Sequence, residues 1–254
     1  MENPASKFDL AYLNADGNKE ELLGLVKTAV KVGARCAMVH VGDAKFIRRA
    51  LDDMNGESPH SVRSEVVIDF PDGAGGEGTK LYQAREAALY KVDGADLVIN
   101  LRQVADKKKS AILRELRAVL SCLPDSKAII QLPYLWRYHH DRIHWLLDIL
   151  VEAEIKCVKD WTTRADNFSK PVAVDDDTRL AYLGYVSNYI SGHNLPLLKK
   201  IAGKVTIQNA KRFLDAGADI LGIGYKKAED IKNALLNSAE NADLEKSSAS
   251  PDKN

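Results

Sequence analysis

The chain alternates between short apolar runs and longer stretches in which apolar residues recur at helical spacing. Residues 8–13 form the first run, which is typical of a β-strand, and residues 19–32 carry apolar side chains three and four positions apart, which is typical of a helix face. Asn18 stands directly before this helix, where its side chain can cap the first turn. The same succession of strand and helix then repeats along the chain.

Seven further strands are expected from the apolar runs that follow. They cover residues 36–41, 65–70, 95–100, 127–132, 155–159, 197–202 and 219–223. Parallel strands need crossover connections, which are usually helices, so repeated strand–helix units favour a parallel sheet covered by helices. Eight units predict an α/β fold, a (β/α)8 TIM barrel, in a single domain over residues 1–238. Residues 239–254 are poor in large apolar side chains, and we expect them to form a polar, disordered tail.

An open, doubly wound sheet is the alternative architecture for such a chain. That fold normally places a glycine-rich GxGxxG motif after its first strand, and residues 13–20 contain no such motif. The length of 254 residues also agrees with a barrel, for which about 250 residues are typical. The barrel is therefore the favoured fold.

Composition makes several classes of partner improbable. The 36 basic and 36 acidic residues give a formal net charge of zero, so neither nucleic acid nor an anionic membrane surface is expected as a partner. No apolar run approaches the ~18 residues of a membrane-spanning helix. The first residues contain no apolar signal-peptide core, and Cys36, Cys122 and Cys157 form no CxxC pair. We therefore expect a cytoplasmic protein with reduced thiols.

Three charged residues lie in or near the ends of predicted strands. Asp96 lies in the fourth strand, Lys159 ends the sixth, and Lys200 lies near the end of the seventh. The carboxyl ends of parallel barrel strands meet at one face, which is where barrel enzymes build their active sites. Alternation places Lys159 on the same side of its strand as Cys157, and Lys200 on the same side as Leu198. We expect both lysines to face one pocket.

Two ammonium groups in one pocket disfavour each other's charge, and burial adds to this effect. One lysine is therefore expected to have a lowered pKa and to act as a nucleophile that forms a Schiff base with a carbonyl compound. Asp96 would move protons or stabilise the charged partner. Spacing alone leaves a second interpretation open, in which these residues are ordinary ion pairs at the mouth of the barrel.

Segments spread over most of the chain carry a further signal. They are Asp9-Leu10 with Leu13-Asn14, Phe70-Pro71 with Gly73, and residues 95–100, 157–159, 200–205 and 216–218. From about residue 9 to residue 236, the chain resembles the deoxyribose-phosphate aldolase family of (β/α)8 class I aldolases. The resemblance implies that Lys159 forms the Schiff base and that Lys200 and Asp96 relay protons.

The resemblance also implies a reaction and its partners. The expected reaction is the reversible cleavage of 2-deoxy-D-ribose 5-phosphate to acetaldehyde and D-glyceraldehyde 3-phosphate, so the partners are a small aldehyde and a sugar phosphate. Neither a metal nor another cofactor is expected. Barrels of this family commonly form dimers, and a homodimer is expected here.

The chain departs from the family pattern in the segments that would bind the phosphate group. After Lys159 the family usually has Thr-Ser-Thr-Gly, whereas residues 160–164 are Asp-Trp-Thr-Thr-Arg. Residues 203–204 are Gly-Lys instead of two glycines, and residues 222–225 replace a glycine-serine-serine stretch. Arg164 and Lys204 can compensate as charged ligands. The implied substrate-binding residues are Asp9, Thr162, Arg164, Gly203, Lys204, Gly222 and Gly224.

Near the expected carbonyl pocket, His40 replaces a cysteine and Gln131 replaces a glutamate that the family often has. Two alternative functions stay open. The first, which follows from the altered phosphate-binding segments, is a Schiff-base aldolase of the same family that acts on a different sugar or aldehyde. The second is a barrel that binds or regulates without catalysis, and the joint presence of Asp96, Lys159 and Lys200 weighs against it.

Two further features allow more than one interpretation. The glycine-rich residues 72–80 lack the order of a phosphate-binding loop, so they are either a mobile loop or a lid that faces the substrate. His140 and His144 have a spacing that can bind zinc on one helix face, and His139 lies beside them. No glutamate completes an HExxH motif, so we expect a solvated or interface helix rather than a metal site.

Overall fold

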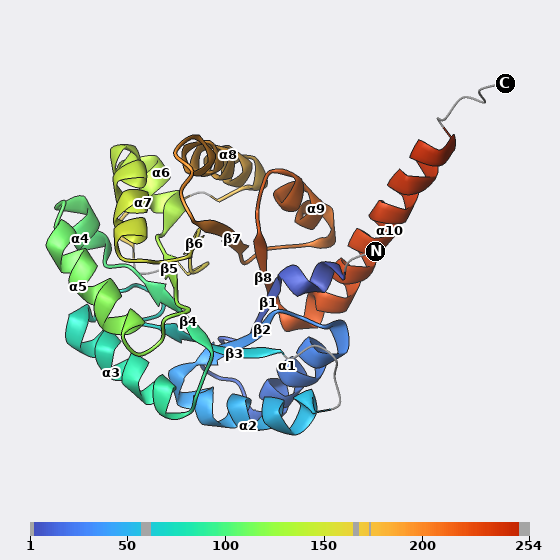
Figure 1. The fold of residues 1–254 in the computed structure, drawn as a ribbon, viewed down its shortest axis with the longest axis horizontal. Helices are drawn as coiled ribbons and strands as arrows, with labels where there is room; N and C mark the ends of the chain where they lie inside the picture. Colours follow the sequence, from blue (N-terminus) through green and yellow to red (C-terminus); the bar gives the residue numbers. More distant parts are fainter. Residues whose placement is uncertain (1–2, 57–61, 165–167, 173, 249–254) are drawn as a thin grey trace.

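The computed structural model describes residues 3–56, 62–164, 168–172 and 174–248 (Figure 1). Within them, eight parallel strands pair in chain order, and the last pairs with the first to close a barrel. The strands are β1 (Phe8–Ala11), β2 (Cys36–His40), β3 (Arg63–Ile68), β4 (Gly94–Val98), β5 (Lys127–Ile129), β6 (Cys157–Lys159), β7 (Leu198–Ala202) and β8 (Ile220–Gly224). Each overlaps one of the strands expected from the apolar runs, and the predicted (β/α)8 fold is confirmed.

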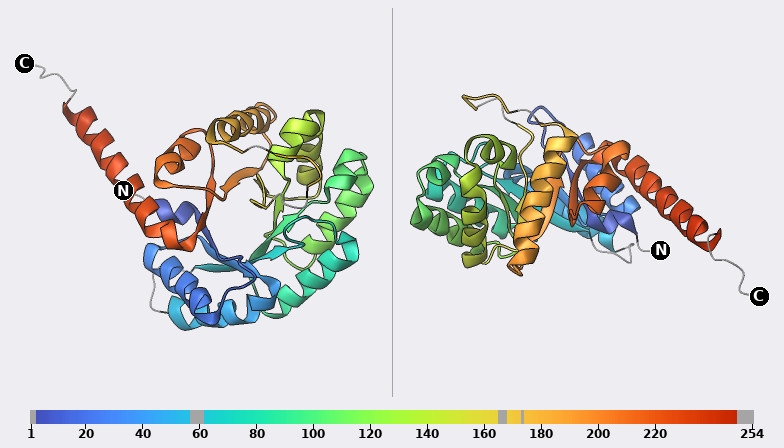
Figure 2. Two further views of the ribbon diagram at one scale, coloured as in Figure 1. Left: turned by 180° about the vertical axis from the view of Figure 1, so that it is seen from behind. Right: turned by 90° about the horizontal axis from the view of Figure 1, so that it is seen from above.

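Helices follow the strands and surround the barrel, as Figures 1 and 2 show. They are α1 (Lys19–Val32), α2 (Ala44–Asn55), α3 (Gly76–Leu89), α4 (Leu101–Ala105), α5 (Lys109–Leu120), α6 (Leu132–Tyr138), α7 (Ile143–Glu152), α8 (Asp176–Gly192), α9 (Ile207–Asp215) and α10 (Ala228–Ser248). The expected cap of α1 is present, because the Asn18 side chain accepts hydrogen bonds from the backbone N–H groups of Glu20 and Glu21 at 3.0 and 3.1 Å. None of the described helices is both long enough and apolar enough to cross a membrane.

The buried part of the molecule contains both apolar clusters and a group of charged side chains. Strand residues such as Leu10 and Leu97 belong to a large apolar cluster that also contains the buried faces of the helices. A second, small apolar cluster of described residues consists of Cys36, Met38 and Val67. On the strands, buried charged side chains belong to Asp9, Glu65, Asp96, Lys127, Lys159 and Lys200. Barrel interiors are usually filled by branched apolar residues, so this concentration of buried charge is typical of a functional site and not of a packed core.

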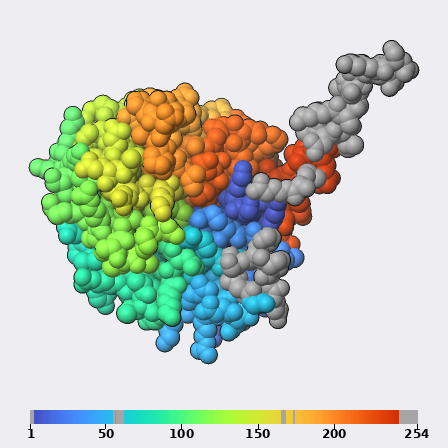
Figure 3. Space-filling model, in the orientation of Figure 1, coloured from blue at the N-terminus to red at the C-terminus, as the bar shows by residue number. Residues whose placement is uncertain are grey.

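The last helix, α10, continues through residues 239–248, where the sequence predicts a disordered tail. Figure 2 shows this helix extending away from the barrel, and the space-filling view in Figure 3 shows that the barrel and its covering helices form a rounded body. Residues 228–248 contain no glycine or proline and are rich in alanine, leucine, glutamate and lysine, which favour helices. The structure thus differs from the expectation over residues 239–248, and residues 249–254 lie outside the described residues.

The glycine-rich residues 72–80 are in part helical, because α3 begins at Gly76. The side chain of Lys80 is buried, where it pairs with Glu115 on α5 and donates a hydrogen bond to the carbonyl oxygen of Gly73 at 3.0 Å. It also lies 3.3 Å from a carboxylate oxygen of Asp69, just after β3. Lys80 therefore ties α3 to its neighbours, and neither a mobile loop nor a lid describes the second half of this segment.

The histidine-rich segment packs against α8. The ring of His144 stacks on Tyr185 and Tyr189, with ring centroids 4.4 and 3.8 Å apart. His140 lies beside Trp136 and Tyr185 in the same row of rings, at centroid distances of 4.7 and 4.5 Å. These contacts make the segment a helix–helix interface within the chain.

Candidate active site

A cavity of about 400 Å³ opens beyond the carboxyl ends of β1, β6, β7 and β8. Its lining includes both expected catalytic lysines, Lys159 and Lys200. It also includes every expected substrate-binding residue, namely Asp9, Thr162, Arg164, Gly203, Lys204, Gly222 and Gly224. Asp96 does not line the cavity itself but lies behind the two lysines, which both contact it. The structure thus brings together the charged residues that the sequence singled out.

The two lysines meet at one carboxylate oxygen. Lys159 and Lys200 are direct neighbours in the β6–β7 register. Each donates a hydrogen bond from Nζ to Oδ2 of Asp96, at 2.8 Å in both cases. Lys200 also pairs with Oδ2 of Asp9 at 2.6 Å. The two amines can therefore exchange protons through a shared oxygen.

The surroundings shift the pKa values of Lys159 and Lys200 in opposite directions. Burial and the neighbouring charge of Lys200 lower the pKa of Lys159 from its ordinary value, although Asp96 opposes that shift. Burial also acts to lower the pKa of Lys200, but Asp9 and Asp96 outweigh it, so this pKa is raised. Lys159 therefore loses its proton more readily than Lys200 does. The expectation that one lysine has a lowered pKa is confirmed for Lys159.

Both inner carboxylates are held in the ionised form. Burial alone would raise the pKa of Asp96, but Lys127, Lys159 and Lys200 together hold it well below its ordinary value. Burial likewise acts to raise the pKa of Asp9, and its cationic neighbours lower it further than burial raises it. Because the resting carboxylates are charged, they accept hydrogen bonds and stabilise nearby cations.

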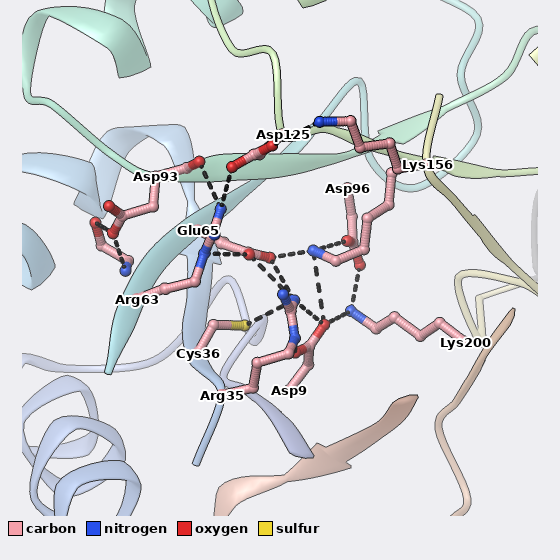
Figure 4. A network of polar contacts seen from close by, with 12 residues as sticks. Asp9, Arg35, Cys36, Arg63, Glu65, Asp93, Asp96, Asp125, Lys156 and Lys200 are labelled. Atoms are coloured by element: carbon pink, nitrogen blue, oxygen red, sulfur yellow. Dashed lines mark hydrogen bonds and ion pairs between the residues drawn. The ribbon is translucent and has the colours of Figure 1, made fainter. Parts of the chain in front are cut away.

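Three residues of this network were not identified from the sequence. Lys127 pairs with Glu65 and donates a hydrogen bond to Oδ1 of Asp96 at 3.1 Å. Arg35, just before β2, reaches both Asp9 and Glu65, as Figure 4 shows. One signal could have identified Lys127: it begins the fifth strand, and alternation places its side chain on the same side as Ile129. The sequence does not indicate, however, which side chains of different strands meet inside the barrel.

Asp9, Cys36 and Glu65 form the one group of three close metal-ligand side chains among the described residues. Arg35 already contacts all three: its Nη2 lies 2.8 Å from Asp9 Oδ2, 3.1 Å from Glu65 Oε1 and 3.8 Å from Cys36 Sγ. Burial raises the pKa of the Cys36 thiol well above its ordinary value, which favours the neutral thiol beside Arg35. The guanidinium supplies the positive charge that these groups require.

The residues after Lys159 are held by contacts outside the barrel interior. Asp160 accepts hydrogen bonds from the Tyr182 hydroxyl at 2.9 Å and from the backbone N–H of Ala202 at 2.8 Å, and it pairs with Arg179 at 3.2 Å. The indole N–H of Trp161 donates to the carbonyl oxygen of Ala202 at 2.9 Å. The departure from the family pattern at residues 160–161 thus anchors the loop after β6 to β7.

Gly203 and Gly222 line the cavity at positions where a larger side chain would collide with its neighbours. A Cβ atom on Gly222 would lie 2.6 Å from Cβ of Ala202 and 3.3 Å from Cε of Lys200. A Cβ atom on Gly203 would lie 1.7 Å from Cγ2 of Thr163, and the φ of +69° at Gly203 also favours glycine. Gly224, by contrast, has nothing within 4 Å of its Cβ position.

Positive charge gathers around the outer part of the cavity. Lys204 lies with its Nζ 5.9 Å from the ring centre of Trp161, and Arg164 donates a hydrogen bond to the carbonyl oxygen of Leu13 at 3.0 Å. Lys226 and Lys227 also line the cavity, and they were not identified from the sequence. This end of the cavity can bind an anionic group.

Neither His40 nor Gln131 lines the cavity. The His40 ring nitrogen Nε2 lies 3.2 Å from the carbonyl oxygen of Leu13, and Met38, two residues earlier, lines the cavity instead. Gln131 is buried and donates hydrogen bonds to Thr162 Oγ1 and to the carbonyl oxygen of Pro71, both at 3.0 Å. It therefore supports a lining residue from behind.

Known proteins resemble the chain over most of its length. It is 32% identical over 220 residues to a deoxyribose-phosphate aldolase of Dictyoglomus turgidum, an alignment that covers 86% of this chain and 91% of that protein. It is 26% identical over 217 residues to deoxyribose-phosphate aldolase 1 of Mesoplasma florum, covering 85% and 90%. No protein-family model matches the chain.

Solved structures share the fold. The deoxyribose phosphate aldolase of Aeropyrum pernix, described as having a unique tetrameric structure, superposes with a TM-score of 0.74 at 22% identity, covering 91% of this chain and 90% of its own. The aldolase QR15 superposes with a TM-score of 0.75 at 22% identity, covering 93% and 99%.

Proposed function

The chain belongs to the deoxyribose-phosphate aldolase family, and we propose that it is a lyase that cleaves 2-deoxy-D-ribose 5-phosphate reversibly through an imine on Lys159. The products are acetaldehyde and D-glyceraldehyde 3-phosphate. One observation carries the assignment of the imine: Lys159 lines the cavity, and its pKa is lowered beside a second lysine whose pKa is raised. The proposed reaction uses no metal and no other cofactor.

Imine formation begins when neutral Lys159 attacks the aldehyde carbon C1 of the open-chain sugar. A C–N bond forms, and the carbonyl oxygen becomes a hydroxyl after a proton passes from nitrogen to oxygen. The ammonium of Lys200 then donates a proton to this hydroxyl, which leaves as water. The product is an iminium ion on Lys159 and a neutral amine on Lys200.

Cleavage of the C2–C3 bond follows. Neutral Lys200 removes the proton of the C3 hydroxyl, C3 becomes the aldehyde of glyceraldehyde 3-phosphate, and the electron pair of the broken bond moves through C2 to the iminium nitrogen. Lys200, again an ammonium, protonates C2 of the resulting enamine. Water then adds to the iminium carbon while Lys200 takes up a proton, and acetaldehyde is released.

Asp96, for which the family resemblance implies a proton relay, passes protons between the two amines in this proposed sequence and is the anion that both of them contact. Its Oδ2 accepts hydrogen bonds from both Lys159 and Lys200, so it keeps the two nitrogens close while the proton moves. Its buried negative charge also stabilises the iminium ion, because an ion pair is stronger in a medium of low dielectric constant. Asp9 likewise stabilises the ammonium of Lys200 by an ion pair, and its side chain lines the cavity in which the substrate would bind.

The phosphate group of the substrate is proposed to bind at the outer, basic part of the cavity. Lys204 and Arg164 supply charge there, while Thr162, Gly203, Gly222 and Gly224 allow the phosphate to approach the backbone. Lys227 adds charge beside Gly224, whereas the ammonium of Lys226 pairs with Glu21 at 2.9 Å. Three basic side chains at this end, Lys204, Arg164 and Lys227, favour a phosphorylated sugar over a neutral one.

Reductive trapping tests the proposed function. With borohydride and acetaldehyde, peptide mass spectrometry should find an ethyl group on Lys159. With deoxyribose 5-phosphate it should find on Lys159 the reduced pentose phosphate, an ethyl group from cleaved substrate, or both. An adduct on a different lysine, or none with any aldehyde, would contradict the assignment and favour a barrel without catalysis. A preference for deoxyribose 5-phosphate over free deoxyribose of under ~10-fold in kcat/KM, about 1.4 kcal/mol, would favour a different substrate.

We also propose that the enzyme acts as a homodimer in the cytoplasm. Family barrels do assemble, as the tetramer described for the Aeropyrum pernix protein illustrates. Light scattering at several protein concentrations should give twice the mass of the chain, and a tetrameric or monomeric mass would contradict the dimer. Cell fractionation tests the location.

A further inference from the structure

A second layer of charge lies beneath the lysines and the aspartate of the site. It consists of Arg35, which stands just before β2, and Glu65, which is completely buried on β3. Figure 4 shows the guanidinium of Arg35 between the carboxylates of Glu65 and Asp9. Neither lines the cavity, so neither can touch the substrate directly.

Arg35 is connected to Lys200 through Asp9. Its Nε and Nη2 donate hydrogen bonds to the two carboxylate oxygens of Asp9, at 2.5 and 2.8 Å. This two-pronged contact fixes the plane of the carboxylate, since the guanidinium is rigid and flat. The oxygen Oδ2 that Arg35 holds is also the one that lies 2.6 Å from Nζ of Lys200.

Glu65 is connected to Asp96 through Lys127. It pairs with Nζ of Lys127, and that same nitrogen donates a hydrogen bond to Oδ1 of Asp96 at 3.1 Å. Since Lys127 occupies Oδ1, the oxygen Oδ2 of Asp96 stays available to Lys159 and Lys200. Glu65 also contacts Arg35 at 3.1 Å, so the two connections form one network.

We propose that Arg35 and Glu65 are positioning residues of the aldolase site, Arg35 acting on Lys200 through Asp9 and Glu65 acting on Asp96 through Lys127. The proposal rests on the proposed function of Lys159 and Lys200. It assigns to these two side chains an effect on the reactivity of Lys159, which neither of them touches.

Stability gives no sufficient reason for this pair. Buried ion pairs lose much of their attraction to the cost of removing both charges from water, and apolar residues of similar volume often stabilise a fold as well or better. In this barrel, however, hydrogen bonds and ion pairs connect Arg35 and Glu65 to the amines of Lys159 and Lys200. Removing Arg35 makes the interior more negative, whereas removing Glu65 makes it more positive, so the two changes should shift Lys159 in opposite directions.

The groups that face these residues are all known. Lys159 faces Asp96 on β4 and Lys200 on β7, with Asp160 next to it in the chain. Besides Arg35, Glu65 faces Lys127 and, at 3.4 Å, Nε of Arg63. Arg35 faces Asp9, Glu65 and Cys36, and its charge also interacts with those of Arg63 and Lys127. We expect the pKa of Lys159 to shift after either substitution through these contacts.

The test compares Arg35→Gln, Glu65→Gln and the double variant with the unchanged protein. Two quantities are measured against pH: kcat/KM for deoxyribose 5-phosphate, and the rate at which acetic anhydride acetylates Lys159, read by peptide mass spectrometry. The acidic limb of both should move to higher pH in Arg35→Gln and to lower pH in Glu65→Gln, by about half a pH unit or more. The double variant should lie near the unchanged protein.

Arg114→Gln and Glu77→Gln are the matched controls, because these residues form an exposed ion pair between α5 and α3, at 3.4 Å, outside the network. They should leave both limbs in place. Limbs that stay in place in Arg35→Gln and Glu65→Gln, or that move in the same direction, would overturn the proposal. The acetylation rate reports Lys159 without turnover, so an inactive unchanged protein would refute the proposed function and still leave the positioning role measurable.

If a neutral variant does not fold, as judged by circular dichroism, Arg35→Lys and Glu65→Asp replace it. They keep the charge and change the geometry. We expect the limbs to stay in place while kcat falls by about 10-fold or more, since misplaced catalytic groups lose rate. Unchanged kcat in both would overturn the proposal.

Discussion

Lys159 and Lys200 share one oxygen atom, Oδ2 of Asp96, which accepts a hydrogen bond of 2.8 Å from each. The arrangement holds the proposed nucleophile and the proposed proton donor at the same oxygen atom, at the wall of one cavity. It also explains why two chemically identical side chains differ: Lys200 contacts a second carboxylate, Asp9, at 2.6 Å, and Lys159 does not. The ion pair between Lys200 and Asp9 thus separates the roles proposed for the two lysines.

The pH dependence of activity should reflect this division. Lys159 must lose its proton to react, and its pKa is lowered, so the acidic limb of kcat/KM lies below 10.5, the ordinary lysine value. Lys200 must keep its proton, and its pKa is raised, so the basic limb lies above 10.5. Rates measured from about pH 5 to about pH 11 test both limbs. An acidic limb above the ordinary lysine value would contradict the assignment.

Replacing Lys159 by methionine should remove activity without weakening the fold. We expect kcat/KM to fall by about 10³-fold or more, because no imine can form. The unfolded chain binds a proton at this position more readily than the folded chain does, which costs the native protein stability below the ordinary lysine pKa. Differential scanning calorimetry near neutral pH should therefore give a Tm equal to or above that of the unchanged protein.

That gain in Tm should shrink as the pH rises toward the ordinary lysine pKa, because the folded and unfolded chains then bind the same number of protons at Lys159. Lys156→Met is the control, since Lys156 is exposed and its partner, Asp125, lies 3.7 Å away. It should retain activity. A strongly lowered Tm in Lys159→Met would indicate a structural role for this amine.

Lys204→Ala tests the basic end of the cavity. We expect KM for deoxyribose 5-phosphate to rise by roughly 10-fold, which corresponds to about 1.4 kcal/mol of binding free energy. Borohydride trapping with acetaldehyde should be unaffected, because that compound carries no phosphate. Lys211→Ala, in which an exposed i,i+4 pair with Asp215 is lost, should leave KM unchanged. Equal effects of Lys204→Ala on both assays would argue against a phosphate contact.

Gly222→Ala should damage both the barrel and the reaction. The added methyl group would lie 2.6 Å from Cβ of Ala202 and 3.3 Å from Cε of Lys200, so β7 or the lysine must move. Overpacking of this kind typically costs about 1–3 kcal/mol of stability. Urea unfolding and kcat/KM measure the two effects.

Gly184→Ala is the control for Gly222→Ala. Gly184 lies within α8 and has nothing within 4 Å of its Cβ position, so alanine should raise helix stability by about 0.5–1 kcal/mol and leave turnover unchanged. If Gly222→Ala were as harmless as this control, the space around Lys200 would be larger than the structure indicates.

The sequence was informative wherever a local pattern determines the structure. Alternation along a strand sufficed to place Lys159 and Lys200 on the inner side, and Asn18 marked the start of α1. The charges of Arg35 and Glu65 gave no such signal. Their partners lie on other strands, 26 to 62 residues away in the chain, and only the closure of the barrel brings them together.

The end of the chain illustrates a different limit. Residues 239–248 contain too few large apolar side chains to predict packing, and the sequence analysis therefore expected a disordered tail. Helix formation does not require packing where a helix is already started, because each added residue extends an existing hydrogen-bond ladder. With no glycine or proline between Gly224 and Pro251, α10 runs on to Ser248.

The separation between an apolar layer outside the strands and a charged interior has an evolutionary consequence. The packing of helices on the sheet involves residues such as Leu10 and Leu97, which belong to a different buried cluster from Cys36, Met38 and Val67. Substitutions that retune the reaction can therefore accumulate inside the barrel while the outer layer continues to support the fold. In this architecture, selection can change the chemistry and the scaffold at different rates.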